Sequence, residues 1–118
     1  MIIGIGIDLV ELSRLKELKD ERFLLRVLSN DEKKVYENIT AEQTRLTYLG
    51  GRFAAKEAIF KAISKGPGST NYKDFSILND EQGKPYVKTD YFKHQEIIHL
   101  SITHTDKYAV AQVIIESR

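Results

Sequence analysis

The first residues of the chain alternate between apolar side chains and positions that are small or acidic. Ile3, Ile5, Ile7 and Leu9 share one parity, and the positions between them hold two glycines followed by Asp8. A period of two is typical of a β-strand with one buried face, so we expect the isoleucines to be buried. The glycine face exposes backbone, which suits close packing against another element or an approaching ligand. Asp8 on that face is either an ordinary acid at a strand end or a functional carboxylate.

The next segment, residues 13–28, follows the spacing of a helix. Its apolar anchors are Leu15, Leu18, Leu24, Val27 and Leu28. A break is expected near Asp20. Residues 11–26 carry five basic and four acidic side chains, a mixture typical of a solvated helix face.

Two capping boxes predict where the following helices begin. The pairs of residues that form them are Ser29 with Glu32 and Thr40 with Gln43. They predict a short helix over 30–38 and a long helix from about 41 to 64. The segment 65–68, with the sequence KGPG, ends the long helix because proline and glycine do not continue it. Gly50 and Gly51 in mid-helix indicate a kink, or close contact of the helix backbone with a neighbouring element.

The last third of the chain is predicted to be β-structure. Residues 75–79 and 85–88 flank a turn-rich segment and predict a hairpin. Residues 97–103 alternate, and residues 108–115 form a longer apolar run after a short loop. The order is an N-terminal strand, then helices including one long helix, then an antiparallel β meander. We therefore predict an α+β fold.

Composition narrows the class of protein. The 118 residues, 42% of them hydrophobic, predict one domain over 1–118 with a single core, and the net charge of +1 gives no general attraction to nucleic acid. The absence of cysteine excludes disulfides and thiol catalysis. The N-terminus lacks the basic region of a signal peptide, and no apolar run reaches the roughly 20 residues of a membrane span. We expect a cytoplasmic protein with no nucleic-acid or membrane partner.

The long helix carries the second group of chemically informative residues. Glu57 and Lys61 lie four residues apart and share a helix face, as in an ordinary surface ion pair. Arg52, Lys56 and Lys65 crowd further positive charge into the same half of the helix. Cations near a helix C-terminus suit its dipole, and they would also form a cradle for phosphate oxygens. The two interpretations remain open at this level.

Asp8 and Glu57 together would suit magnesium if the first strand packs on the long helix. Mg²⁺ takes oxygen ligands, often one or two carboxylates completed by substrate phosphates. The three histidines do not have zinc-binding spacing. Ser101 and His104 lack the nucleophile elbow of a serine hydrolase, and no P-loop motif is present.

Three motifs resemble the holo-acyl-carrier-protein synthases, the bacterial primary-metabolism type of phosphopantetheinyl transferase. They are GIGIDLVEL at the start, GRFAAKEAIFKA in the long helix and HLSITHTDKYAVAQV near the end. The resemblance implies a magnesium-dependent transfer of phosphopantetheine from coenzyme A to a serine of apo acyl carrier protein. Adenosine 3′,5′-bisphosphate is the other product, and the carrier becomes active for fatty acid synthesis. The resemblance also implies a homotrimer with active sites between subunits.

Individual roles follow from the same resemblance. The implied catalytic residues are Asp8, Glu57, Lys61 and His104, of which Asp8 and Glu57 bind the metal. The residues implied to bind coenzyme A are Arg52, Lys61, Ser64, Lys65, Gly66, Gly83, Pro85, Ser101, His104 and Thr105. Those implied to dock the acidic carrier protein are Arg14, Arg22 and Arg26. The chain departs from its relatives at Phe60, where many have a small residue, and at 64–67, where many have a glycine–threonine–glycine turn.

Two other functions use the same residues. A different metal-dependent phosphate enzyme would turn over nucleotides without a carrier protein. A non-catalytic module would bind an acidic partner through its lysines, and this binding would not depend on magnesium or coenzyme A.

Overall fold

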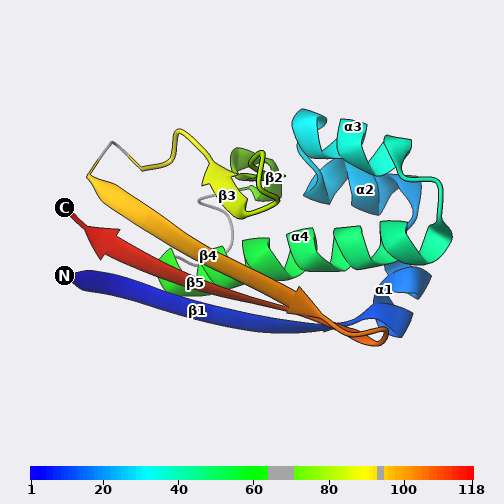
Figure 1. Cartoon of the computed structure of the whole chain (residues 1–118), viewed down its shortest axis with the longest axis horizontal. Coiled ribbons are helices and arrows are strands. Elements are labelled where there is room, and N and C mark those ends of the chain that lie inside the picture. The colour runs from blue at the N-terminus through cyan, green and yellow to red at the C-terminus, as the bar shows by residue number, and fades with distance from the viewer. Residues whose placement is uncertain (64–70, 93–94) are drawn as a thin grey trace.

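A computed structural model of the chain describes residues 1–63, 71–92 and 95–118. The helices are α1 (Leu12–Leu18), α2 (Glu21–Val27), α3 (Asn30–Asn38), α4 (Glu42–Ile63) and the short 3₁₀ turn η1 (Tyr72–Asp74). The strands are β1 (Ile2–Glu11), β2 (Ser76–Asn79), β3 (Pro85–Lys88), β4 (Glu96–His104) and β5 (Tyr108–Ser117). Figure 1 shows α4 between the long strands on one side and α2 and α3 on the other. The predicted α+β class is confirmed.

The strands form two antiparallel sheets. The larger has the order β1-β5-β4, so the first strand of the chain pairs with the last, with Asp8 opposite Ala111. The smaller is the β2–β3 hairpin, which closes with Asn79 opposite Pro85. Gly83 in its turn has a φ of 83°, a left-handed conformation that glycine adopts readily. The predicted hairpin is therefore confirmed.

Two glycines allow β1 to lie directly on α4. A Cβ atom added to Gly4 would lie 2.1 Å from the carbonyl oxygen of Ala62, and one added to Gly6 would lie 1.8 Å from that of Ala58. No side chain fits at either position. Asp8 has the same parity as these glycines, so the strand presents its carboxylate on the side of the long helix.

The opposite face of β1 is exposed, which contradicts the sequence-based expectation. Ile3, Ile5, Ile7 and Leu9 are each between 54% and 61% exposed. The prediction was wrong because both faces of this strand lack polar side chains before Asp8, and the face with the bare backbone is the one that packs on the helix. An isolated chain thus carries a row of unburied aliphatic side chains.

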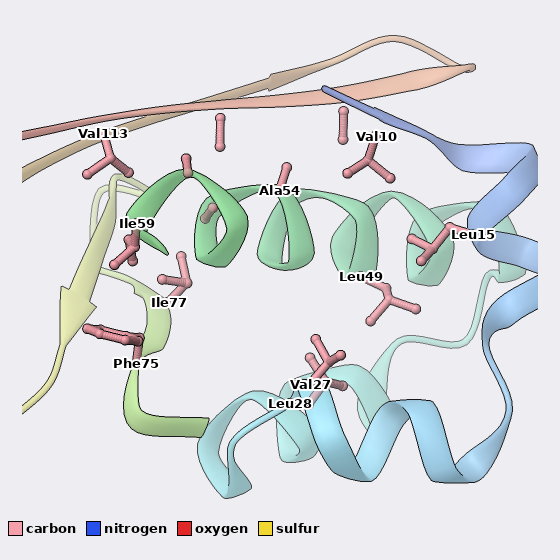
Figure 2. Packing of buried hydrophobic residues seen from close by; sticks show 14 of the residues in the cluster. Val10, Leu15, Val27, Leu28, Leu49, Ala54, Ile59, Phe75, Ile77 and Val113 are labelled. Atoms are coloured by element: carbon pink, nitrogen blue, oxygen red, sulfur yellow. The ribbon is translucent and has the colours of Figure 1, made fainter. Parts of the chain in front are cut away.

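The core lies on both sides of α4. Figure 2 shows Val10 and Val113 of the sheet above this helix, and Val27 and Leu28 below it. All four are buried, as is Leu49 within α4. The central helix is therefore shielded from solvent along most of its length.

The helix boundaries largely follow the predicted signals. Asp20 separates α1 from α2 and caps α2 by accepting a hydrogen bond from Phe23 N at 2.8 Å. The Ser29 capping box is present at the start of α3. At the start of α4, however, the Gln43 side chain donates to the carbonyl of Asp106 at 3.3 Å instead of reaching back to residue 40.

The glycine pair of α4 allows neighbouring side chains to approach the helix backbone closely, which is one of the two predicted reasons for the pair. A Cβ atom at Gly50 would lie 2.5 Å from the side chain of Leu12, and one at Gly51 would lie 3.2 Å from the side chain of Ile102. None of the helices in the described part of the chain has the length and apolar content that crossing a bilayer demands.

Candidate active site

Packing of β1 on α4 brings Asp8 together with Lys61. The Lys61 ammonium donates to Asp8 Oδ1 at 3.0 Å and to the carbonyl of Ile7 at 2.9 Å. The lysine side chain is 55% exposed and the aspartate 17%. Lys61 therefore bridges helix and strand while its charge remains accessible to an anionic ligand. The i, i+4 spacing of Lys61 with Glu57 did not reveal this partner.

Glu57 is half-buried and accepts a hydrogen bond from a residue that the sequence did not single out. The Tyr72 hydroxyl donates to Glu57 Oε1 at 2.5 Å. Burial raises the pKa of Tyr72 to about 12, and the neighbouring Glu57 carboxylate contributes to the rise. Tyr72 thus remains a neutral donor at physiological pH.

Both carboxylates line one cavity. An open cavity of about 440 Å³ is lined by β1, α1, α4 and the start of β5, and Asp8, Glu57, Arg14 and Phe53 are on its wall. Asp8 and Glu57 thus line the same cavity, and their convergence on one cation stays a prediction. Within the described residues, no group of three or more His, Cys, Asp or Glu is placed to hold a metal ion. Two carboxylates are enough to bind Mg²⁺ when substrate phosphates and water molecules fill its remaining coordination positions.

A second cavity collects several residues predicted to bind coenzyme A. It has a volume of about 580 Å³ and is lined by Arg52, His104 and Thr105, among others. It shares no lining residue with the cavity of Asp8 and Glu57. Among the described residues of one chain, the two predicted metal ligands and these three predicted nucleotide-site residues therefore line separate cavities.

Arg52 is buried, and two of its guanidinium nitrogens bind the second sheet. Its guanidinium donates to the carbonyl of Ile77 and to Asn79 Oδ1, both at 3.1 Å, and lies 4.2 Å from the Tyr48 ring centroid. These contacts attach the β2–β3 hairpin to α4. The hairpin carries Gly83 in its turn and Pro85 at the first position of β3.

The β4–β5 turn holds the last predicted nucleotide-site residues. Thr105 Oγ1 accepts from the amides of Lys107 at 3.1 Å and Tyr108 at 3.0 Å, which shapes the turn beside His104. Ser101 is exposed on the outer face of β4, on the same side of the sheet as Ile5. The predicted residues Ser64, Lys65 and Gly66 lie outside the described part of the chain.

The three arginines predicted to dock a carrier protein lie on α1 and α2. Arg14 is on the wall of the cavity that holds Asp8 and Glu57. Arg22 and Arg26 are exposed on α2, and the Arg26 guanidinium lies 5.6 Å from the centroid of the Phe23 ring. Of these three arginines, Arg14 thus adjoins the acidic cavity, whereas Arg22 and Arg26 are not among its lining residues.

Lys56 does not belong to a phosphate cradle, contrary to the sequence-based interpretation. Its side chain is fully buried and donates to Glu32 and to the carbonyl of Val27, both at 2.5 Å. Glu32 also accepts from the amide of Ile77 at 2.7 Å. Burial lowers the pKa of Lys56. The pair joins α3, α4 and β2 in the interior and is inaccessible to substrate.

Replacing Lys56 by alanine is expected to cost about 3–5 kcal/mol of unfolding free energy, because the Glu32 carboxylate would remain buried without its cation. Urea unfolding monitored by circular dichroism measures the loss. The exposed Lys34→Ala change in α3 is the matched control and should stay within about 0.5 kcal/mol. A loss below about 1 kcal/mol for Lys56→Ala would show that this ion pair does not hold the three elements together.

Tyr72 is the site residue that sequence reasoning missed. It follows the long helix after a turn-rich segment, and no motif includes it. One sequence feature could have predicted an aromatic partner here: Phe53 and Phe60 lie on the same helical face as Glu57 and offer a surface on which another ring can pack. Phe60, a noted departure from the relatives, packs on Tyr72 with ring centroids 5.1 Å apart.

Comparisons with known proteins agree with the motifs. The profile of the 4′-phosphopantetheinyl transferase superfamily matches residues 4–113. The holo-(acyl-carrier-protein) synthase of Acholeplasma laidlawii is 48% identical over 120 residues, which cover 100% of this chain and 99% of that protein. That of Staphylococcus carnosus is 46% identical, with 98% of each chain covered.

A solved structure of a relative has a closely similar fold. The Bacillus anthracis holo-(acyl-carrier-protein) synthase, in complex with CoA (3′,5′-ADP), superposes with a TM-score of 0.91 at 39% identity. The match covers 100% of this chain and 99% of that one. The chain therefore belongs to the 4′-phosphopantetheinyl transferase superfamily, among the holo-(acyl-carrier-protein) synthases.

Proposed function

We propose that this protein transfers phosphopantetheine from coenzyme A to a serine of an apo acyl carrier protein, at a site built around Asp8, Glu57 and Lys61. The observation that carries the site is the shared cavity of the two carboxylates, beside an exposed lysine that strand and helix hold in place. The names of the full-length relatives, and the coenzyme A complex of the Bacillus anthracis protein, support the reaction.

We assign Asp8 and Glu57 as the ligands of a divalent cation, with oxygen donors suited to magnesium or manganese. Such an ion would neutralise charge on the diphosphate of coenzyme A and on the departing adenosine 3′,5′-bisphosphate. Lys61 supplies a second positive charge at the same place. Its pairing with Asp8, which lines the cavity, holds the exposed ammonium beside that carboxylate, where it can bind phosphate oxygens.

The reaction needs a base for the carrier serine. The serine oxygen attacks the phosphorus that bears pantetheine, and the bond from that phosphorus to the bridging oxygen breaks. We assign Glu57 as the group that takes the serine proton, because its donor Tyr72 is neutral and leaves the negative charge uncancelled, whereas Asp8 is paired with the cationic Lys61. No covalent enzyme intermediate is required, so positioning and charge carry the catalysis.

We further propose a homotrimer, with Arg52, His104 and Thr105 of one subunit completing the site of its neighbour. Two features support it. The two cavities of one chain share no lining residue, and the outer face of β1 leaves a row of aliphatic side chains exposed. Exposed apolar faces of this kind are typical of subunit interfaces.

Arg14, Arg22 and Arg26 are the proposed docking residues for the acidic carrier. Arg14→Glu is expected to raise the KM for carrier protein about tenfold or more, with a much smaller change in the KM for coenzyme A. Steady-state kinetics with each substrate varied in turn measure both constants. Lys34→Glu, the same charge reversal on α3, is the matched control. Equal effects on both substrates, or no effect, would remove Arg14 from the docking surface.

One assay tests the function as a whole. Apo carrier protein, coenzyme A and magnesium are mixed with the enzyme, and the carrier is weighed by mass spectrometry for an added phosphopantetheine. Nucleotide turnover without carrier would instead indicate another phosphate enzyme. Carrier binding that is indifferent to magnesium and coenzyme A would indicate a non-catalytic module. One domain over 1–118 and a cytoplasmic location remain sequence-based predictions.

A further inference from the structure

Three aromatic side chains surround the half-buried carboxylate of Glu57. Phe53 and Phe60 precede and follow Glu57 by four and three residues, so all three lie on one face of α4. Tyr72 of η1 lies against this face, with its ring centroid 5.8 Å from that of Phe53 and 5.1 Å from that of Phe60. The two phenylalanines therefore hold the tyrosine ring over the turn of helix that carries the acid.

The tyrosine hydroxyl is directed at the carboxylate. It donates to Glu57 Oε1 at 2.5 Å, a short bond of the charge-assisted kind. Tyr72 also lies within the electrostatic influence of Asp8 and Arg26. The donor thus belongs to the same neighbourhood as both carboxylates, although it comes from a separate part of the chain.

A neutral donor has a particular effect on a catalytic carboxylate. It occupies one lone pair of Oε1 and restricts rotation of a side chain that otherwise samples several rotamers. It leaves Oε2 available and does not cancel the negative charge, as a lysine partner would. Asp8 has the opposite arrangement, since its partner Lys61 is cationic and largely exposed.

We propose that Tyr72 is a positioning residue: clamped by Phe53 and Phe60, it fixes the Glu57 carboxylate in the orientation that divalent-cation binding and transfer require. The inference rests on the proposed function of Glu57. It also gives Phe60 a role, because this bulky residue supplies one side of the clamp.

Tyr72→Phe removes the hydroxyl and keeps the ring with both of its aromatic contacts. Binding of Mn²⁺ is measured by electron paramagnetic resonance with coenzyme A present and carrier protein absent. Loss of a partner that orients a metal ligand typically weakens binding about 10–100-fold, and we expect a loss in that range. The KM for coenzyme A should change by less than about twofold, because other side chains bind the nucleotide. Tyr86→Phe, which removes an exposed hydroxyl on β3, should leave Mn²⁺ affinity unchanged.

A double-mutant cycle with Glu57→Ala, which removes the acceptor of the tyrosine hydroxyl, separates positioning from a general structural role. If Tyr72 acts through Glu57, Tyr72→Phe should have less than about a twofold effect on Mn²⁺ affinity in the Glu57→Ala background. The same fold-loss in both backgrounds would show independent action and overturn the proposal. So would unchanged Mn²⁺ affinity in the single variant.

Two further measurements keep the test decisive. Should Tyr72→Phe fail to fold, Phe60→Leu retains the hydroxyl and loosens the clamp. A loss of Mn²⁺ affinity of about tenfold or more then supports the proposal, and unchanged affinity overturns it. Wild-type protein that neither binds Mn²⁺ with coenzyme A nor modifies the carrier overturns the proposed function together with this inference. Wild-type protein that does both, beside an unaltered Tyr72→Phe variant, overturns the role of Tyr72 alone.

Discussion

Glu57→Gln is expected to lower the kcat of phosphopantetheine transfer about 10³-fold while the protein remains folded. The amide has the shape of the acid, and its oxygen can still accept the hydrogen bond from Tyr72. What it lacks is the negative charge, which a divalent cation needs in a ligand, and the capacity to take the serine proton. Since both assigned roles depend on charge, an isosteric change removes them together.

The experiment compares initial rates of carrier modification at limiting and at saturating magnesium, with circular dichroism to verify the fold. Glu37→Gln is the matched control, because it makes the same change at an exposed position of α3. Transfer by Glu57→Gln at a rate near that of the wild type, at limiting as well as saturating magnesium, would remove Glu57 from the mechanism. A loss of rate at limiting magnesium that saturating magnesium restores would retain Glu57 as a ligand and assign the proton to another base.

Local patterns in the sequence predicted most elements because the relevant interactions are themselves local. The capping box of Ser29 with Glu32 involves residues three apart, and the turn before Pro85 depends on Gly83 alone for its left-handed conformation. The pairing of β1 with β5 joins the two ends of the chain, and the alternation of side chains in either strand does not predict which strand it pairs with. That pairing, however, forms the sheet on which α4 packs.

Burial was harder to predict than secondary structure. Alternation in β1 shows that the strand has two distinct faces, but it does not identify which one packs inward. Ile5 is exposed because Gly6 permits backbone contact with α4, which a face of larger side chains would prevent. Lys56 illustrates the converse: its charge indicated a surface position, but Glu32, 24 residues earlier, compensates that charge in the interior.

For the candidate site, the sequence identified the acids but not their partners. Asp8 and Glu57 were recognisable from motif and residue type, and they line a common cavity. The donors that orient them, Lys61 for Asp8 and Tyr72 for Glu57, depend on the packing of strand and loop against the helix. The two partners of each hydrogen bond are 53 and 15 residues apart in the sequence, so helix or strand periodicity does not predict either pairing.

Ile5→Lys is expected to convert the proposed trimer into monomers and to lower the transfer rate about 100-fold or more. Ile5 lies opposite Ile114 on the exposed face of the sheet, and it is 61% exposed in a single chain. A lysine there costs an isolated subunit little, but an interface would bury an unpaired ammonium, at a cost of several kcal/mol for each copy. The loss of activity follows if the cavity of Asp8 and that of His104 must come from neighbouring subunits.

Light scattering coupled to size-exclusion chromatography measures the mass of the assembly, which should fall from three times that of one chain to that of one chain. Val35→Lys is the matched control, since it places the same charge at a half-exposed apolar position on α3, away from the sheet. It should remain assembled and active. An Ile5→Lys protein that stays trimeric would show that this face is not the interface. A monomeric variant with full activity would place the complete site within one chain, so that Arg52, His104 and Thr105 would have to serve the carboxylates of their own subunit.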